Sequence, residues 1–234
     1  MDRRFDLIVF DWDGTVMDST PHIAESLRAA CVELGLVPPS LEEASWIIGM
    51  GLTPGMQRVL PDLDPAEYPR LSAAYRRHFL AGDHVLPLFP GMAELVVALA
   101  QAGNLLAVAT GKTRLGLERA FEQSGLRAHF HASCCADESF AKPNPAMLFE
   151  VMDRTGVLPT RTLMIGDTSH DLQMAANAGV AAVAVSYGAH GREELEAFAP
   201  HAVSDSAHEL RAWLARAGQL GRFAIDAPLR DAGT

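Results

Sequence analysis

Residues 5–15 read FDLIVFDWDGT, an apolar run that ends in two carboxylates and a glycine. A run of this length and composition, Phe5–Phe10, predicts a buried strand that ends near the turn pair Asp13–Gly14. Asp11 and Asp13 then stand at the carboxyl end of that strand. Taken alone, an Asp–Gly pair is equally well an ordinary turn, so the role of the two acids depends on the rest of the chain.

Four further runs of strand length follow in the second half of the chain. Each is uniformly apolar rather than alternating, as parallel strands covered on both faces are. They are Leu105–Ala109, Phe130–Ser133, Thr162–Ile165 and Val180–Val185. Helices with start signals lie among them at Arg114–Gln123, Ala146–Arg154 and Asp171–Ala178. Strand and helix therefore alternate, which predicts an α/β fold with a doubly wound parallel sheet, a Rossmann-like core.

Residues 16–89 interrupt this alternation, because they contain no predicted strand. Helices are predicted there at Pro21–Leu34, at Leu41–Ile48, after Thr53–Pro54 and from Pro65 to Ala81. In an open α/β sheet the ligand crevice lies beyond the carboxyl ends of the strands, so an insertion at this point lies over the crevice. We interpret residues 16–89 as an inserted all-helical cap domain and residues 1–15 and 90–217 as the catalytic core. Residues 218–234 carry Gly, Pro and scattered charge without periodicity, which predicts a mobile tail.

The composition narrows the classes of partner. The chain has 29 acidic and 19 basic side chains and a formal net charge of -10, and its only lysines are Lys112 and Lys142. A negative field of this kind repels nucleic-acid backbones and anionic membranes, which argues against both as partners. Three cysteines form no even disulfide framework, and no apolar run is long enough for a membrane span or a signal peptide. These features favour a cytoplasmic protein.

Polar side chains follow four of the predicted strands. Because the carboxyl ends of parallel strands meet at one edge of a sheet, we expect these side chains to lie together. They are Asp11 with Asp13, Thr110 with Gly111, Lys142, and Asp167 with Asp171. Singly, each has an ordinary explanation, such as an acid placed favourably at a helix start or a solvated surface lysine. Their joint occurrence indicates a functional site.

The residue types at this site indicate a particular chemistry. Crowded carboxylates require a cation, and hard oxygen ligands without a His or Cys cluster favour Mg²⁺. Threonine hydroxyls, backbone amides and ammonium groups bind phosphate oxygens. This chain uses arginine for nearly every other cation, so the retained lysines suggest a geometric demand, and Lys142 is the stronger candidate of the two. A carboxylate nucleophile with a second acid two residues away completes a site for phosphoryl transfer through an aspartyl-phosphate.

With all of these motifs in order, residues 5–215 resemble the haloacid dehalogenase-like hydrolases, and among them the helical-cap phosphatases, most closely those of the phosphoglycolate type. The resemblance implies that Asp11 attacks the phosphoryl group and that Asp13 acts as general acid and base. It also implies Mg²⁺ held by the carboxylates of Asp11 and Asp167 and the main-chain carbonyl of Asp13. Thr110, the Gly111 amide and Lys142 would bind phosphoryl oxygens, with Asp171 steadying Lys142 and the metal waters.

The substrate is less well defined by the sequence. The cap segment Gly49-Met50-Gly51 resembles a substrate loop of phosphoglycolate phosphatases, although a flexible helix connection explains it equally well. We therefore expect a small phosphorylated metabolite, with 2-phosphoglycolate ahead of sugar phosphates, nucleotides and pyrophosphate. A β-phosphoglucomutase-like enzyme and a non-catalytic metal- or ligand-binding module are the alternatives. Contacts of Lys112 or His22 with substrate stay open, and Trp12 is mainly a packing residue with a weaker claim to the site entrance.

Overall fold

The computed structural model describes residues 4–82 and 86–220. Its core is one six-stranded sheet in the order β3-β2-β1-β4-β5-β6, and every neighbouring pair is parallel. The strands are β1 (Leu7–Phe10), β2 (Leu105–Thr110), β3 (Ala132–Cys135), β4 (Thr162–Gly166), β5 (Ala181–Val185) and β6 (Val203–Ser204). The predicted doubly wound parallel sheet is therefore confirmed.

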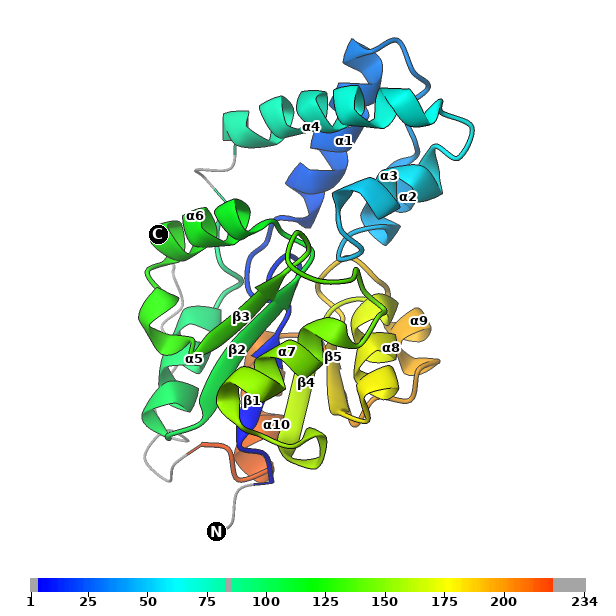
Figure 1. Ribbon diagram of the computed structural model, residues 1–234. Coiled ribbons are helices and arrows are strands. Elements are labelled where there is room, and N and C mark those ends of the chain that lie inside the picture. Colours follow the sequence, from blue (N-terminus) through cyan, green and yellow to red (C-terminus); the bar gives the residue numbers. More distant parts are fainter. Residues whose placement is uncertain (1–3, 83–85, 221–234) are drawn as a thin grey trace.

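Helices cover both faces of the sheet (Figure 1). They are α5 (Met92–Gln101), α6 (Arg114–Ser124), α7 (Ala146–Thr155), α8 (Ser169–Ala178), α9 (Arg192–Glu196) and α10 (Ala207–Arg216). Ile8 and Phe10 of β1 pack in one hydrophobic cluster with α5, α6 and α10, whereas Leu7 and Val9 pack in another with α7 and α8. This alternation explains why the strand is apolar at every position.

Two strands begin two residues later than predicted. β1 begins at Leu7 rather than Phe5, and β3 begins at Ala132 rather than Phe130. A 3₁₀ turn at Arg127–His129 precedes Phe130, whose ring packs edge to face on Phe10 in the core. Phe130 is therefore apolar because of core packing and not because of strand pairing.

The segment before α5 is helical, as predicted. It contains α1 (Thr20–Glu33), α2 (Leu41–Trp46), α3 (Leu52–Val59) and α4 (Tyr68–Gly82), and a 3₁₀ turn at Pro65–Glu67 precedes α4. The capping box of Ser40 and Glu43 starts α2. The four helices share a hydrophobic cluster of their own and lie over the carboxyl ends of the strands (Figure 1).

The two chain segments that connect the cap to the core run side by side. The amide of Asp18 donates to the Pro87 carbonyl over 2.9 Å, and the amide of Phe89 donates to the Val16 carbonyl over 3.1 Å. Met17 forms isolated bridges to both Asp13 and Leu88. The cap boundary at residues 16–89 stays a prediction, and these contacts place its two ends together.

Beyond the last helix, Gln219 and Leu220 are buried, and the Asn104 amide donates to the Gln219 carbonyl over 2.8 Å. The remainder of the predicted tail, residues 221–234, lies outside the described residues. Within residues 4–82 and 86–220, the helices are all too short or too polar to cross a bilayer.

Candidate active site

Three carboxylates meet at the ends of the two central strands. The Asp11 amide donates to the Ile165 carbonyl over 2.9 Å, which extends the pairing of β1 with β4 by one step. Asp167 follows β4, and Asp171 lies in the first turn of α8. Oxygens of Asp11, Asp167 and Asp171 lie within 4.8 Å of one another, and all three residues are buried. The structure thus brings together the acids that the sequence placed at one sheet edge.

Lys142 reaches this cluster from the loop before α7. Its ammonium lies 2.8 Å from Asp11 Oδ1 and 2.7 Å from Asp171 Oδ1, and its side chain is 0% exposed. Burial alone would lower the pKa of Lys142, but the charges of Asp11 and Asp171 outweigh it and raise that pKa. Lys142 is therefore a permanent cation beside the predicted nucleophile.

Burial makes the ionised forms of Asp11 and Asp167 less favourable. Burial raises the pKa of Asp11 to about 7, against the opposing charge of Lys142. Burial, followed by the charges of Asp11 and Asp171, also raises the pKa of Asp167 well above its usual range. With all three carboxylates ionised, as metal binding requires, one ammonium leaves this buried cluster with two net negative charges. A divalent cation would balance that charge.

The donor set fits Mg²⁺. Asp11 Oδ2 is buried and accepts no hydrogen bond from any residue in the described ranges, so its lone pairs are free for a cation. Asp171 is more fully occupied, because Lys142 donates to its Oδ1 and the Thr168 hydroxyl donates to its Oδ2 over 2.6 Å. This difference supports a ligand role for Asp11 and a supporting role for Asp171.

Gly14 allows the turn after Asp13 to pack directly against Asp167. It has φ +81°, and a Cβ at this position would overlap the Asp167 carboxylate. Asp167 is oriented by the Thr15 hydroxyl, which donates to its Oδ1 over 2.8 Å, and by the Ala189 amide, which donates to its Oδ2 over 2.8 Å. The glycine of the first motif is therefore required both for a turn and for a close approach.

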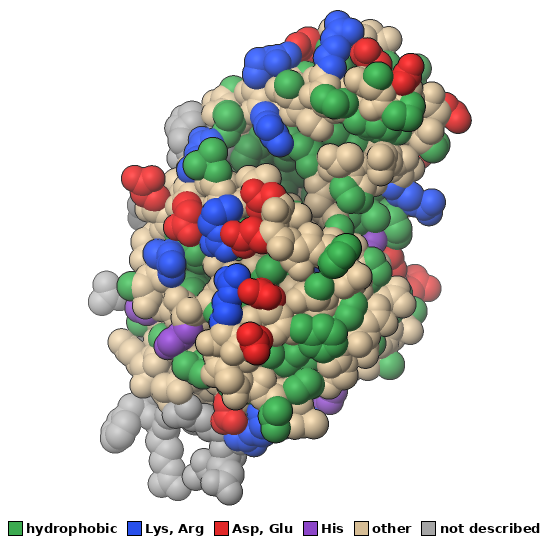
Figure 2. Space-filling model, viewed as in Figure 1, with side chains coloured by type: hydrophobic (Ala, Val, Ile, Leu, Met, Phe, Trp, Pro, Cys, Tyr) green, Lys and Arg blue, Asp and Glu red, His purple; other side chains and the backbone are tan. Residues whose placement is uncertain are grey.

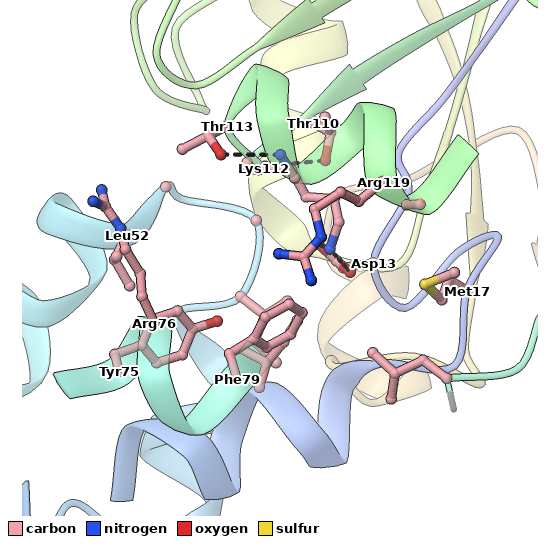
Figure 3. A pocket seen from close by; sticks show the side chains of 18 of the residues that line it. Asp13, Met17, Leu52, Tyr75, Arg76, Phe79, Thr110, Lys112, Thr113 and Arg119 are labelled. Atoms are coloured by element: carbon pink, nitrogen blue, oxygen red, sulfur yellow. Dashed lines mark hydrogen bonds and ion pairs between the residues drawn. The ribbon is translucent and has the colours of Figure 1, made fainter. Parts of the chain in front are cut away.

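Asp13 occupies a separate position on the cap side. The ammonium of Lys112 donates to its Oδ1 over 2.7 Å and to its Oδ2 over 3.0 Å (Figure 3). Ser19 also donates to Oδ1, over 2.5 Å. Lys112 thus holds the predicted acid and base, which gives it a firmer place in the site than the sequence assigned. Ser19 was missed, because a serine before a helix is typical of a cap residue.

The predicted phosphate loop faces the cap loop. Thr110 is fully buried at the end of β2, and Thr110 and Gly111 both line the cavity described below. A Cβ on Gly111 would stand 2.9 Å from the carbonyl oxygen of Gly49. Gly49 and Gly51 line the cavity, whereas Met50 is not among its lining residues. Two members of the predicted substrate loop therefore reach the site.

A cavity of about 420 Å³ lies between cap and core above Asp11 and Asp13. Figure 2 shows the recess between the two parts, with hydrophobic side chains in it. Its apolar lining comes from both parts and includes Met17, Ile23, Leu27, Ile47, Ile48, Leu52, Phe79, Leu80, Leu86 and Leu115. Lys142, Asp167 and Asp171 are not lining residues, so Asp11 is the member of the carboxylate cluster that reaches the cavity.

Trp12 and His22, which the sequence left as candidates for the site, lie outside the cavity lining. The Trp12 side chain is fully buried and packs edge to face on Phe121 at 5.1 Å between ring centroids. The idea that it lines the entrance is wrong, because strand-like alternation turns it away from Asp11 and Asp13 into the core. His22 uses Nε2 to donate to the Phe79 carbonyl over 2.8 Å and so supports the cap internally.

A second cap contact was not predicted. The Trp46 carbonyl, at the end of α2, accepts from Nε2 of His170 over 3.1 Å and from Nε2 of His190 over 2.9 Å. The Trp46 indole stacks on His190 and donates to Glu194 over 3.0 Å. These partners are more than 120 positions away in the chain, so no local pattern could reveal the contact.

A model of the family described as haloacid dehalogenase-like hydrolase matches residues 8–185. The chain belongs to the haloacid dehalogenase-like hydrolases. This hydrolase is 33% identical over 211 residues to "Probable phosphatase IndB" of Dickeya dadantii, covering 87% of this chain and 91% of that protein. It is also 33% identical over 221 residues to the phosphoglycolate phosphatase of Aliivibrio fischeri, covering 90% and 97% of the two chains.

Solved structures agree with this assignment. The crystal structure of a predicted phosphoglycolate phosphatase from Haemophilus somnus matches with a TM-score of 0.79 and 25% identity, covering 90% of this chain and 98% of that chain. The haloacid dehalogenase-like hydrolase described here is therefore an enzyme, similar to phosphatases of the phosphoglycolate type.

Proposed function

We propose that the chain is a Mg²⁺-dependent phosphatase that hydrolyses a small phosphomonoester through an aspartyl-phosphate intermediate. The observation that carries this proposal is the Asp11 carboxylate. It lies at a strand end beside Lys142, has a free Oδ2 and lines a cavity large enough for a substrate. A buried carboxylate with these neighbours is suited to nucleophilic attack on phosphorus.

The chemistry divides into two displacements. In the first, an Asp11 oxygen forms a bond to phosphorus, the ester P–O bond breaks, and Asp13 gives its proton to the leaving alkoxide. In the second, Asp13 takes a proton from water, the water oxygen bonds to phosphorus, and the bond between phosphorus and Asp11 breaks. Inorganic phosphate leaves and the Asp11 carboxylate is restored, so Asp13 serves first as acid and then as base.

The remaining residues would bind the phosphoryl oxygens and the metal ion. Lys142, the Thr110 hydroxyl and the Gly111 amide are the groups for phosphoryl oxygens. We assign Asp11, Asp167 and the main-chain carbonyl of Asp13 to Mg²⁺, which supplies positive charge to the phosphoryl group when bound. Asp171, already bonded to Lys142, keeps the ammonium in place.

For the substrate, the names of the relatives support 2-phosphoglycolate as the first compound to test. The backbone at Gly49 and Gly51 faces the same cavity and is available to its carboxylate. No observation favours a phosphoglucomutase-like reaction, since His22 is engaged within the cap and residues 16–89 contain no lysine. The cysteines are all free and buried, in keeping with a proposed cytoplasmic location.

The test is phosphate release from p-nitrophenyl phosphate and from 2-phosphoglycolate, with Mg²⁺ and with EDTA. We expect turnover only with metal and its loss in Asp11→Asn. Undiminished activity in that variant, or in metal-free protein, would contradict the mechanism. Binding of Mg²⁺ and phosphate by calorimetry without any turnover would instead indicate a non-catalytic module.

A further inference from the structure

The cavity is larger than a two-carbon acid requires. Its volume of about 420 Å³ falls within the range of roughly 300–1,000 Å³ that is typical of pockets for drug-sized ligands. The phosphoryl group occupies only its floor, at Asp11 and Thr110. The remaining space lies toward the cap, where the alcohol part of an ester must lie.

This volume is not a result of a cap that has swung away. The Gly49 carbonyl lies against Gly111 of the core, so the cap loop is in contact with the phosphate loop. On another side, the Trp46 carbonyl is bonded to His170 and His190. The space therefore remains while the cap is engaged with the core.

The walls around this space are mostly apolar, although the cavity lining also includes Arg76, Arg119 and Gln123. Leu27 of α1, Ile48 after α2, Leu52 of α3 and Phe79 of α4 line it from the cap, and Leu115 of α6 lines it from the core. A polar group that packs on these apolar side chains would lose its hydration without a partner at that place. An apolar alcohol would gain from leaving water at the same place.

Phe79 is a wall residue close to the Lys112 and Asp13 pair. The Lys112 ammonium, which holds Asp13, lies 5.1 Å from its ring centroid. The Tyr75 ring stacks on the Phe79 ring with 5.9 Å between centroids, and the His22 ring contacts it with 5.1 Å between centroids. Figure 3 shows Phe79 facing the same space as Lys112 and Asp13. The ring is thus fixed beside the group that must protonate the leaving alcohol.

We propose that the preferred substrate is a phosphomonoester whose alcohol carries an apolar body, of the size of a ring or a branched chain, packed on Phe79, Leu52 and Ile48. The proposal rests on the proposed phosphatase function and specifies its substrate class. Phe79 is a specificity-determining residue, because it contacts the leaving group next to Asp13. Phosphoglycolate would then be turned over less efficiently than esters of apolar alcohols.

The test is a series of n-alkyl phosphates from ethyl to hexyl, with 2-phosphoglycolate as reference, assayed on the Mg²⁺-loaded full chain. The alcohols differ little in acidity, so the trend in kcat/KM reports apolar contact and not leaving-group chemistry. We expect kcat/KM to rise about fourfold for each methylene that the cavity buries, and hexyl phosphate to exceed phosphoglycolate. A flat or falling series would overturn the proposal.

Two variants and one binding measurement complete the design. Phe79→Ala should flatten the chain-length trend. Phe149→Ala removes a ring from the surface of α7, where the side chain is 48% exposed, and should leave the trend unchanged. Circular dichroism checks that both variants fold. Equal trends in Phe79→Ala and the wild type would contradict the role of Phe79.

Non-hydrolysable n-alkylphosphonates give a readout that does not need turnover. Their affinity for the wild-type protein, measured by calorimetry, should rise with chain length in the same way. If no ester is hydrolysed, the proposed function fails, and the phosphonate series still tests the apolar pocket. If phosphoglycolate is hydrolysed but neither series depends on chain length, only the inference about substrate class fails.

Discussion

Replacing Lys142 by methionine tests the electrostatics of the site. The ammonium lies 2.8 Å from Asp11 and 2.7 Å from Asp171, with 0% of the side chain exposed. Methionine is unbranched and of similar length, so the packing of the loop should change little. The variant therefore removes one charge from the buried cluster and leaves its shape intact.

The expected loss of unfolding free energy is large because methionine does not replace the charge of the Lys142 ammonium. The Lys142 ammonium stabilises the ionised form of Asp11, whose pKa burial already raises to about 7, and Lys142→Met removes that stabilisation. Removing one partner of a buried ion pair costs about 3–5 kcal/mol of unfolding free energy. Arg154, whose side chain is 46% exposed, pairs with Glu150 and donates to the Ser133 carbonyl over 2.8 Å, and these contacts together contribute about 1–2 kcal/mol. Arg154→Met is therefore the matched control.

Urea unfolding in EDTA measures these differences without a metal contribution. We expect Lys142→Met to lose about 3–5 kcal/mol and its kcat/KM with Mg²⁺ to fall about 10²–10³-fold, because a group for phosphoryl oxygens is gone. In the double variant with Asp171→Asn, part of the stability should return, with a coupling energy of about 0.5–3 kcal/mol. The reasoning is refuted if Lys142→Met is no less stable than Arg154→Met, or if the double variant shows no coupling.

Three further predictions concern the acids and the cap. Burial raises the pKa of Asp11 to about 7, so the metal-free folded protein holds a proton that the unfolded chain releases near pH 4. The unfolding free energy measured in urea should therefore fall as the pH rises from about 4 to about 7. The fall should be smaller in Asp11→Asn, which lacks this titrating group. Gly111→Ala places a Cβ 2.9 Å from the Gly49 carbonyl oxygen and should lower kcat/KM by up to about 100-fold, whereas Gly191→Ala, with nothing within 4 Å of its Cβ, should match the wild type in the same kinetic assay. Trp46→Phe removes the indole donor to the core and should cost about 0.5–1.5 kcal/mol in urea unfolding and raise KM, and an unchanged KM would show that this contact does not hold the cap.

The sheet and its acids were predictable because their signals are local. Uniformly apolar runs such as Thr162–Ile165 identify central parallel strands, and the residue after each run must then lie at the edge with the others. Asp11 follows from that rule directly and Asp167 stands one residue further on, whereas Lys142, seven residues beyond β3, is identified because lysine is scarce in the chain. β6 has only two residues, Val203–Ser204, so it carries no pattern above that of a loop.

The contacts between cap and core could not be predicted in this way. The bond of His170 to the Trp46 carbonyl joins positions 124 apart, and the bond of His190 to the same carbonyl joins positions 144 apart. Such pairs depend on the angle between two folded parts, which no periodicity in either part specifies. The same holds for the volume of the cavity, since its walls come from separate helices of the cap and from the core.

The pairing of the two connecting segments has a mechanical consequence. Val16 and Asp18 on the outgoing chain are bonded to Phe89 and Pro87 on the returning chain, so the cap is attached through a ribbon rather than through two independent tethers. A ribbon bends easily about one axis and resists sliding and twisting. Met17, in the middle of this ribbon, also bridges to Asp13. The angle of the cap and the position of Asp13, the proposed general acid, are therefore coupled through Met17.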